Sequence, residues 1–149
     1  MMTGGCLCGA VRYEVAADPV YTGHCHCRSC QRASGAGHST YVGVPRAALT
    51  VRGETRFYAA TGGSGLQALR HFCPVCGSQI FGTSEMDPGT ATLYAGSLDD
   101  PSAIRPDAAI NVRSRQLAAV NQLLKNIAGR WEPVSTSSAP AAATIATSQ

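Results

Sequence analysis

Charged side chains are scarce in this chain of 149 residues, where they make up only 14%. The basic residues are arginines apart from the single Lys125, and they are scattered, with no run of five or six. Nucleic-acid binding domains usually carry a basic patch or stripe. Aromatic residues, which often accompany such a stripe, reach only 6%. We therefore expect no nucleic-acid partner.

A membrane span and a secretory signal are also missing from the sequence. No apolar run approaches the ~18 residues that a spanning helix needs, and the segment Met1–Cys6 has neither a basic stretch nor an apolar core. We expect no membrane partner and a cytoplasmic location. Disulfides are rare there, and seven cysteines cannot all pair, so their clustering indicates metal ligands or catalytic thiols.

Glycine is frequent, with 16 residues, and it separates short β-like runs. The expected strands are residues 9–15, 39–44, 49–52, 55–59 and 90–95, with two more on either side of a turn within residues 69–81. Asp87-Pro88-Gly89 is expected to be one of the separating turns. The sequence thus predicts a mainly β protein, with one domain over residues 1–133 and a disordered Ser/Thr/Ala/Pro-rich tail over residues 134–149.

Two helices are expected beside these strands. A short one follows the second group of cysteines, at residues 28–33. The other spans residues 114–128, where Leu117, Val120, Leu124 and Ile127 fall at helical spacing before Gly129. Such an apolar stripe most often packs on a sheet.

Four of the cysteines stand in two short chelating turns, Cys6-Leu7-Cys8-Gly9 and Cys73-Pro74-Val75-Cys76-Gly77. Four thiolates satisfy tetrahedral Zn²⁺ completely, and such a closed site is structural because no position remains for water or substrate. We expect Cys6, Cys8, Cys73 and Cys76 to hold one zinc ion. It would link the two ends of residues 9–72 and stabilise a small core.

The remaining cysteines, Cys25, Cys27 and Cys30, lie within six residues, and no eighth cysteine exists to complete their set. Three protein ligands and an open fourth position are typical of catalytic zinc. Zinc would hold an incoming thiol as a thiolate, ready to attack a small electrophile such as an aldehyde. We therefore expect Cys25, Cys27 and Cys30 to form a catalytic zinc site.

Two alternatives remain open for these three cysteines. His24, His26, His38 or His71 could supply a fourth ligand and close the site, although His26 should point away from its two neighbours in an extended segment. The cysteines could instead form a redox dithiol, but no βαβ pattern supports that reading.

Candidate substrate contacts surround the second group of cysteines. Arg28 and Arg32 could bind the carboxylates of a peptidic thiol through their guanidinium forks, and the loop 62–65, with Gly63 and Ser64, could do so through its amides. Such a loop is more often only a flexible turn, and it lacks the lysine of a phosphate-binding loop.

The cysteine motifs stand in order within GGCLCGAVRYEV (4–15), CHCRSCQRASGAG (25–37), YVGVP (41–45), GGSG (62–65), FCPVCGSQIF (72–81) and AGSLDDP (95–101). Over roughly residues 4–115, this set resembles the glutathione-dependent formaldehyde-activating enzyme family, which also includes centromere protein V. The resemblance implies a β-tent fold of antiparallel sheets, a structural zinc on the first four cysteines and a catalytic zinc on the other three. Residues 109–116 depart from the family pattern.

The activity that the resemblance implies is a carbon-sulfur lyase reaction, in which glutathione and formaldehyde form S-hydroxymethylglutathione. The expected partners are thus a small thiol and a small aldehyde, and the expected cofactor is zinc, two ions per chain. Two other functions stay open: a non-catalytic zinc module that binds a protein partner, and a glutathione or formaldehyde carrier without turnover.

Overall fold

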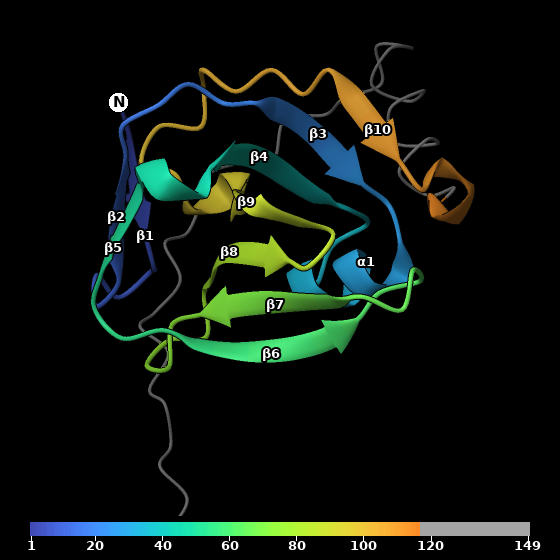
Figure 1. Cartoon of the computed structure of the whole chain (residues 1–149), viewed down its shortest axis with the longest axis horizontal. Helices are drawn as coiled ribbons and strands as arrows, with labels where there is room; N and C mark the ends of the chain where they lie inside the picture. Colours follow the sequence, from blue (N-terminus) through green and yellow to red (C-terminus); the bar gives the residue numbers. More distant parts are fainter. Residues whose placement is uncertain (117–149) are drawn as a thin grey trace, which may run out of the picture. The chain divides into compact units, whose positions relative to one another are not determined.

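The computed structural model describes residues 1–116, and this part of the chain is mainly β, as predicted. None of its helices has the length and apolar character needed to cross a bilayer. Its elements are, in chain order (Figure 1), β1 (Met2–Gly5), β2 (Arg12–Val15), β3 (Tyr21–Cys25), α1 (Arg28–Ser34), β4 (Ser39–Pro45), η1 (Arg46–Ala48), β5 (Leu49–Arg52), β6 (Arg56–Thr61), β7 (Gln67–Phe72), β8 (Gln79–Ser84), β9 (Asp87–Tyr94), η2 (Ala95–Ser97), β10 (Ala108–Ile110) and η3 (Val112–Ser114).

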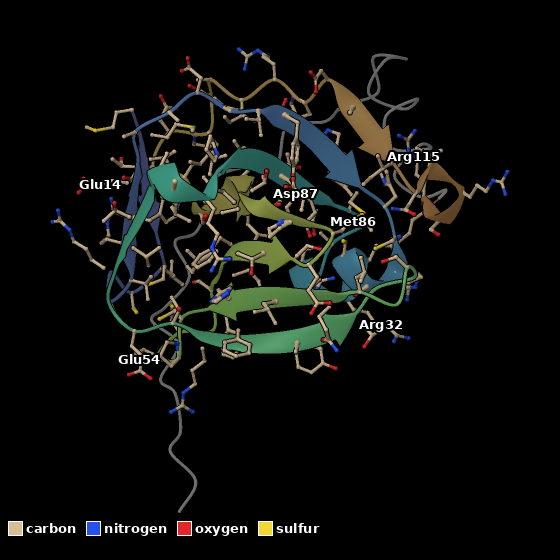
Figure 2. All side chains as sticks on the ribbon, in the orientation of Figure 1. Glu14, Arg32, Glu54, Met86, Asp87 and Arg115 are labelled. Carbon is tan, nitrogen blue, oxygen red and sulfur yellow. The ribbon has the colours of Figure 1, made fainter. Side chains whose placement is uncertain are left out.

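The smaller sheet has the order β1-β2-β5, and both of its strand pairs are antiparallel. Burial alternates along β2, because Tyr13 and Val15 face the core while Arg12 and Glu14 face solvent. Figure 2 shows Glu14 pointing outward from this sheet. The buried face therefore follows the alternation of apolar and charged residues along the strand, which has the period of two of a half-buried strand.

The larger sheet has seven strands in the order β10-β3-β4-β9-β8-β7-β6 (Figure 1). Its neighbours are antiparallel except β10 and β3, which pair in parallel with Ala108 opposite Gly23. This pair departs from the expected all-antiparallel arrangement. The reason is the long segment between η2 and β10, which leads the chain back along the sheet so that β10 runs in the direction of β3.

Apolar residues of both sheets form one buried core. The members with no more than 1% exposure in this cluster are Val11, Tyr13, Val15, Val42, Val44, Cys73, Ile80, Ala91 and Leu93. Because Cys6 and Cys73 also belong to the cluster, the first and third cysteine motifs lie against the core rather than on a free loop.

The short helix predicted after the second group of cysteines is confirmed as α1. It begins after Cys27, whose sulfur accepts the Cys30 backbone N–H at 3.3 Å, and it ends at Gly35, which adopts the left-handed φ of 65°. The second predicted helix, residues 114–128, and the predicted tail fall almost wholly outside the described residues.

Asp87-Pro88-Gly89 does not form a separating turn, because it is the beginning of β9. A proline can occupy this strand since the pairing of β9 with β4 stops at Thr90, and Pro88 therefore faces no β4 partner. On the other side, the register of β8 and β9 shifts between Thr83 and Ser84, which is typical of a bulge. The turn itself lies at Glu85 and Met86.

Candidate metal centres

Cys6, Cys8, Cys73 and Cys76 come together as the four-cysteine cluster, in which all four sulfurs lie within 4.8 Å of one another. Cys6 and Cys8 follow β1, while Cys73 and Cys76 form the turn between β7 and β8. The Sγ–Sγ distance is 3.5 Å from Cys6 to Cys8 and 3.8 Å from Cys8 to Cys73. Zinc bonds of ~2.3 Å in a tetrahedron place sulfurs ~3.8 Å apart. The donor set therefore fits a closed zinc site.

Ser78 connects the two turns of the four-cysteine cluster. Its hydroxyl accepts the Leu7 backbone N–H at 3.1 Å and lies 3.2 Å from Cys76 Sγ. The hydrogen bond from Ser78 is the main reason that the pKa of Cys76 falls to about 5. A second sulfur, that of Cys6, accepts the Val11 backbone N–H at 3.2 Å. These bonds favour the thiolate form that a metal requires.

Cys25, Cys27 and Cys30 form the three-cysteine cluster, whose sulfurs also lie within 4.8 Å of one another. Cys25 is the last residue of β3, Cys27 caps α1, and Cys30 lies in the first turn of that helix. In residues 1–116, which contain all four histidines, no histidine or acidic side chain joins this cluster. Its protein donors in the described part of the chain are therefore three sulfurs.

The histidines near this cluster turn toward one another instead. The ring centroids of His24 and His38 lie 4.7 Å apart, and those of His26 and His38 lie 5.2 Å apart. His26 is buried, and its Nε2 lies 3.4 Å from Arg115. His26 lies away from the sulfurs of Cys25 and Cys27 because an extended backbone directs alternate side chains to opposite faces.

Two side chains donate hydrogen bonds to the sulfurs of the three-cysteine cluster. Tyr41 Oη on β4 donates to Cys30 Sγ at 3.3 Å, and Asn111 Nδ2 donates to Cys25 Sγ at 3.4 Å. The pKa of Cys25 falls to about 7, chiefly because the Cys30 thiol donates to it, while the same contact and burial raise the pKa of Cys30. Without metal, Cys25 is thus the first of these two thiols to ionise.

A cavity of about 300 Å³, the cysteine cavity, opens beside the three-cysteine cluster. Its polar lining includes Cys25, Cys30, Tyr41, Arg70 and Tyr94. Arg70, on β7, donates to Tyr94 Oη at 3.2 Å and to Ser29 Oγ at 2.8 Å. The tyrosine rings pack edge to face, with the centroids of Tyr41 and Tyr94 5.1 Å apart. Strands β3, β4, β7 and β9 therefore all contribute to one pocket at the cluster.

A second cavity, the arginine cavity, measures about 510 Å³ and includes Ser29, Arg32, Tyr58, Arg70 and Gln79 in its lining. Figure 2 shows Arg32 at the end of the sheet where β6 and β7 turn. The arginine cavity thus lies between α1 and the β6-β7 edge of the larger sheet.

The predicted substrate contacts are distributed unevenly around these cavities. Arg32 lines the arginine cavity, whereas Arg28 donates to Gln31 on its own helix. Gly63 and Ser64 are exposed in the turn between β6 and β7, on the side of the sheet where α1 lies (Figure 1), and they line neither cavity. Their role in binding stays a prediction.

Sequence reasoning missed four polar residues near the three-cysteine cluster: Tyr41, Arg70 and Tyr94, which line the cysteine cavity, and Asn111, which donates to Cys25 Sγ. They come from β4, β7, β9 and the position after β10, and although Tyr41 lies in the YVGVP motif, that motif did not single it out as a neighbour of the cysteines. For Asn111 the residue type was the one indication in the sequence, because asparagine tolerates the left-handed backbone conformation. Asn111 adopts that conformation here, with a φ of 55°. The other three come to the cluster through strand order alone.

The fold and the two clusters define a small β protein with two sulfur-rich sites, each able to hold a metal ion. The sequence profile of the "Glutathione-dependent formaldehyde-activating enzyme" family matches residues 1–114. The chain therefore belongs to this family, as its motifs indicated.

One further comparison supports the family assignment, and another supports the fold. A Halomonas elongata protein named "Putative glutathione-dependent formaldehyde-activating enzyme" is 30% identical over an alignment of 104 residues, and the match covers 66% of this chain and 66% of that one. The crystal structure of a Rhodobacter sphaeroides protein is similar, with a TM-score of 0.52 and 23% sequence identity. The similarity covers 70% of this chain and 92% of that one, and it supports the fold alone.

Proposed function

We propose that this protein is a zinc-dependent enzyme of the carbon-sulfur lyase class that joins glutathione and formaldehyde to give S-hydroxymethylglutathione. The observation that carries the proposal is the cysteine cavity, which places Cys25 and Cys30 at the wall of a pocket large enough for a small aldehyde and part of a thiol. Family membership supports the choice of substrates.

The three-cysteine cluster suits zinc because thiolates are the ligands that select this soft metal. Bound zinc would supply Lewis acidity and lower the pKa of a thiol at the open position. The four-cysteine cluster would hold the second, structural ion. We propose two zinc ions per chain, and the β-tent arrangement for the two sheets.

The chain's own residues would prepare the addition in three ways. Tyr41 and Asn111 hold the Cys30 and Cys25 sulfurs by hydrogen bonds, which fixes the ligand atoms before substrate binds. Tyr94 Oη accepts from Arg70, so its own O–H can point to an oxygen in the cavity. In the reaction, the substrate sulfur bonds to the aldehyde carbon, the C=O π bond opens, and the proton lost by the thiol ends on the product hydroxyl.

A cytoplasmic location is part of the proposal. All seven cysteines lie in the described part of the chain and are unpaired thiols there, which suits a reducing compartment.

The test is to mix zinc-loaded protein with glutathione and formaldehyde and to measure exchange between free and adduct species by NMR. We expect exchange clearly faster than in the protein-free mixture, which is essential as a control because the reaction also proceeds unaided. Cys30→Ser should reduce the rate toward that control. Saturable glutathione binding without acceleration would instead identify a carrier, and neither binding nor acceleration would favour a zinc module with a protein partner.

A further inference from the structure

The side chain of Arg70 is a half-buried cation without a carboxylate partner in residues 1–116. The ion pairs in that part of the chain belong to Arg12, Arg52 and Arg56. Arg70 instead donates to two neutral hydroxyls, those of Tyr94 and Ser29. A guanidinium has five N–H donors, so further donors remain. A partly desolvated cation with spare donors is a favourable place for an anion to bind.

The position of Arg70 relates it to both cavities. Among the described residues, it is the one that lines the cysteine cavity and the arginine cavity together. A thiol whose sulfur lies at Cys25 and Cys30 would therefore have Arg70 in the wall of its own cavity, on the side that borders the arginine cavity. Arg32 adds a second positive charge to the arginine cavity.

Two hydrogen bonds hold the guanidinium group of Arg70 between a helix and a strand. The bond to Ser29 reaches α1, the helix that carries Cys30, and the bond to Tyr94 reaches β9. A guanidinium held at two points loses little entropy when it binds a planar carboxylate, and it can do so with two parallel hydrogen bonds.

We propose that Arg70 is the residue that selects a carboxylate-bearing thiol as the substrate, by binding a carboxylate of the thiol at the junction of the two cavities. This inference rests on the proposed function for its choice of ligand. It adds the specificity-determining group, which differs from the arginines of α1 that the sequence pointed to.

A competing role for Arg70 is to offset the negative charge of the cysteine sulfurs. The two roles differ in what they predict for a thiol without carboxylates. If Arg70 binds the substrate's carboxylate, its loss affects only the acidic thiol. If Arg70 acts through the cysteine cluster, its loss affects every thiol equally.

The experiment measures equilibrium binding by calorimetry, with zinc-loaded protein and two probes, glutathione and glutathione dimethyl ester. We expect the wild type to bind glutathione at least 10-fold more tightly than the ester. Arg70→Gln should weaken glutathione binding about 10- to 100-fold, as expected for a lost hydrogen bond to a charged group, and change ester binding less than twofold. Arg70→Lys keeps the positive charge but not the paired N–H donors of the guanidinium. Its affinity for glutathione should therefore lie between those of the wild type and Arg70→Gln.

The matched control is Arg52→Gln, the same change at an exposed arginine of the smaller sheet, which should bind both probes like the wild type. Equal binding of the two probes by the wild type would overturn the proposal. So would an equal loss for both probes in Arg70→Gln. The wild-type comparison can overturn the proposal even if a variant fails to fold, whereas the Arg70 variants separate Arg70 from Arg32. Selective binding without faster adduct exchange would leave this inference standing and remove the proposed reaction.

Discussion

Single side chains around the three-cysteine cluster determine how firmly its sulfurs are held. Tyr41 donates to Cys30 Sγ, and Asn111 donates to Cys25 Sγ. Bonds of this kind orient metal ligands and tune their charge, and their removal commonly costs 10- to 100-fold in metal affinity. Tyr41 is the clearer case because it belongs to β4, a central strand that stays in place when the hydroxyl is removed.

We predict that Tyr41→Phe lowers the zinc affinity of the three-cysteine cluster about 10-fold while the fold is retained. Competition with a coloured chelator measures the affinity, and the four-cysteine cluster serves as the internal reference. Tyr21→Phe is a suitable control, because Tyr21 lines the same cavity but bonds Thr92 rather than a sulfur. Unchanged zinc affinity in Tyr41→Phe would show that this hydrogen bond does not support the site.

The sequence revealed which cysteines cluster but not the residues that support their sulfurs. Cysteines in chelating turns can be recognised because one or two intervening residues already bring two sulfurs together. Tyr41, Arg70 and Tyr94 have no such local relation to the cysteines. They reach the cavity because β4, β9, β8 and β7 are neighbours in the sheet, and strand order is decided by tertiary packing rather than by local pattern.

At the scale of elements, Tyr13 connects β2 with η2. Its hydroxyl lies 2.9 Å from Ser97 Oγ, and burial is the main reason that its pKa rises to about 12. Below pH 10 the side chain is neutral whether the protein is folded or unfolded. Between pH 10 and 12 the unfolded chain ionises first, so unfolding becomes more favourable as the pH rises.

We predict that Tyr13→Phe flattens the alkaline decline in stability. In the wild type this tyrosine should remove up to about 1.4 kcal/mol of unfolding free energy per pH unit above pH 10. At pH 8 the variant should lose only about 1 kcal/mol, because Ser97 Oγ still donates to the Tyr94 carbonyl at 2.7 Å. Urea unfolding at pH 8, 10 and 11 measures both effects. Equal pH slopes for variant and wild type would contradict the prediction.

Strands with several alternating or β-branched residues were predictable even when they contain a glycine, as β4 does, whereas β1 and β3 were not. No pattern in the sequence indicated β1 and β3, which are short and contain Gly4, Gly5 and Gly23. The structure explains two of these glycines by close approach. A Cβ on Gly4 would lie 2.3 Å from Tyr13 Oη, and one on Gly23 would lie 2.9 Å from the Ala108 carbonyl oxygen. From the sequence alone, a glycine that allows a neighbouring strand or ring to approach closely cannot be distinguished from a glycine in a turn.

At the scale of the molecule, the two clusters have different mechanical roles. The four-cysteine cluster joins the segment after β1 to the turn between β7 and β8, and two of its members lie in the core. The three-cysteine cluster spans only six residues at the junction of β3 and α1. A metal ion in the first cluster constrains a long stretch of chain, whereas one in the second constrains a short one.

We predict that Cys73→Ser and Cys27→Ser each reduce the zinc content from two ions to one but differ in stability. Cys73→Ser should lower the melting temperature by about 10 °C or more, because it opens the long cross-link and places a hydroxyl in the core. Cys27→Ser should change it by only a few degrees, since serine also caps a helix. Calorimetry and elemental analysis provide the two measurements.

Similar melting temperatures for these two variants would mean that the four-cysteine cluster does not act as a cross-link. Cys27→Ser is the matched control because it makes the same chemical change at a cysteine of the other cluster. Both variants should be compared in the presence of excess zinc, so that partial loading does not imitate a loss of stability.

The parallel pair of β10 and β3 also affects how the protein is made. The backbone N–H of His26 donates to the Ile110 carbonyl at 3.0 Å, and Asn111 then reaches Cys25, so the surroundings of the three-cysteine cluster are completed by β10. A ribosome needs roughly 4 to 17 seconds to add the 85 positions from Gly23 to Ala108. During that interval the nascent chain already carries Cys25, Cys27 and Cys30 without their full surroundings. These thiols are then open to oxidation or to capture by a competing metal, and with zinc as the proposed occupant, its supply during synthesis would be part of the maturation of this protein.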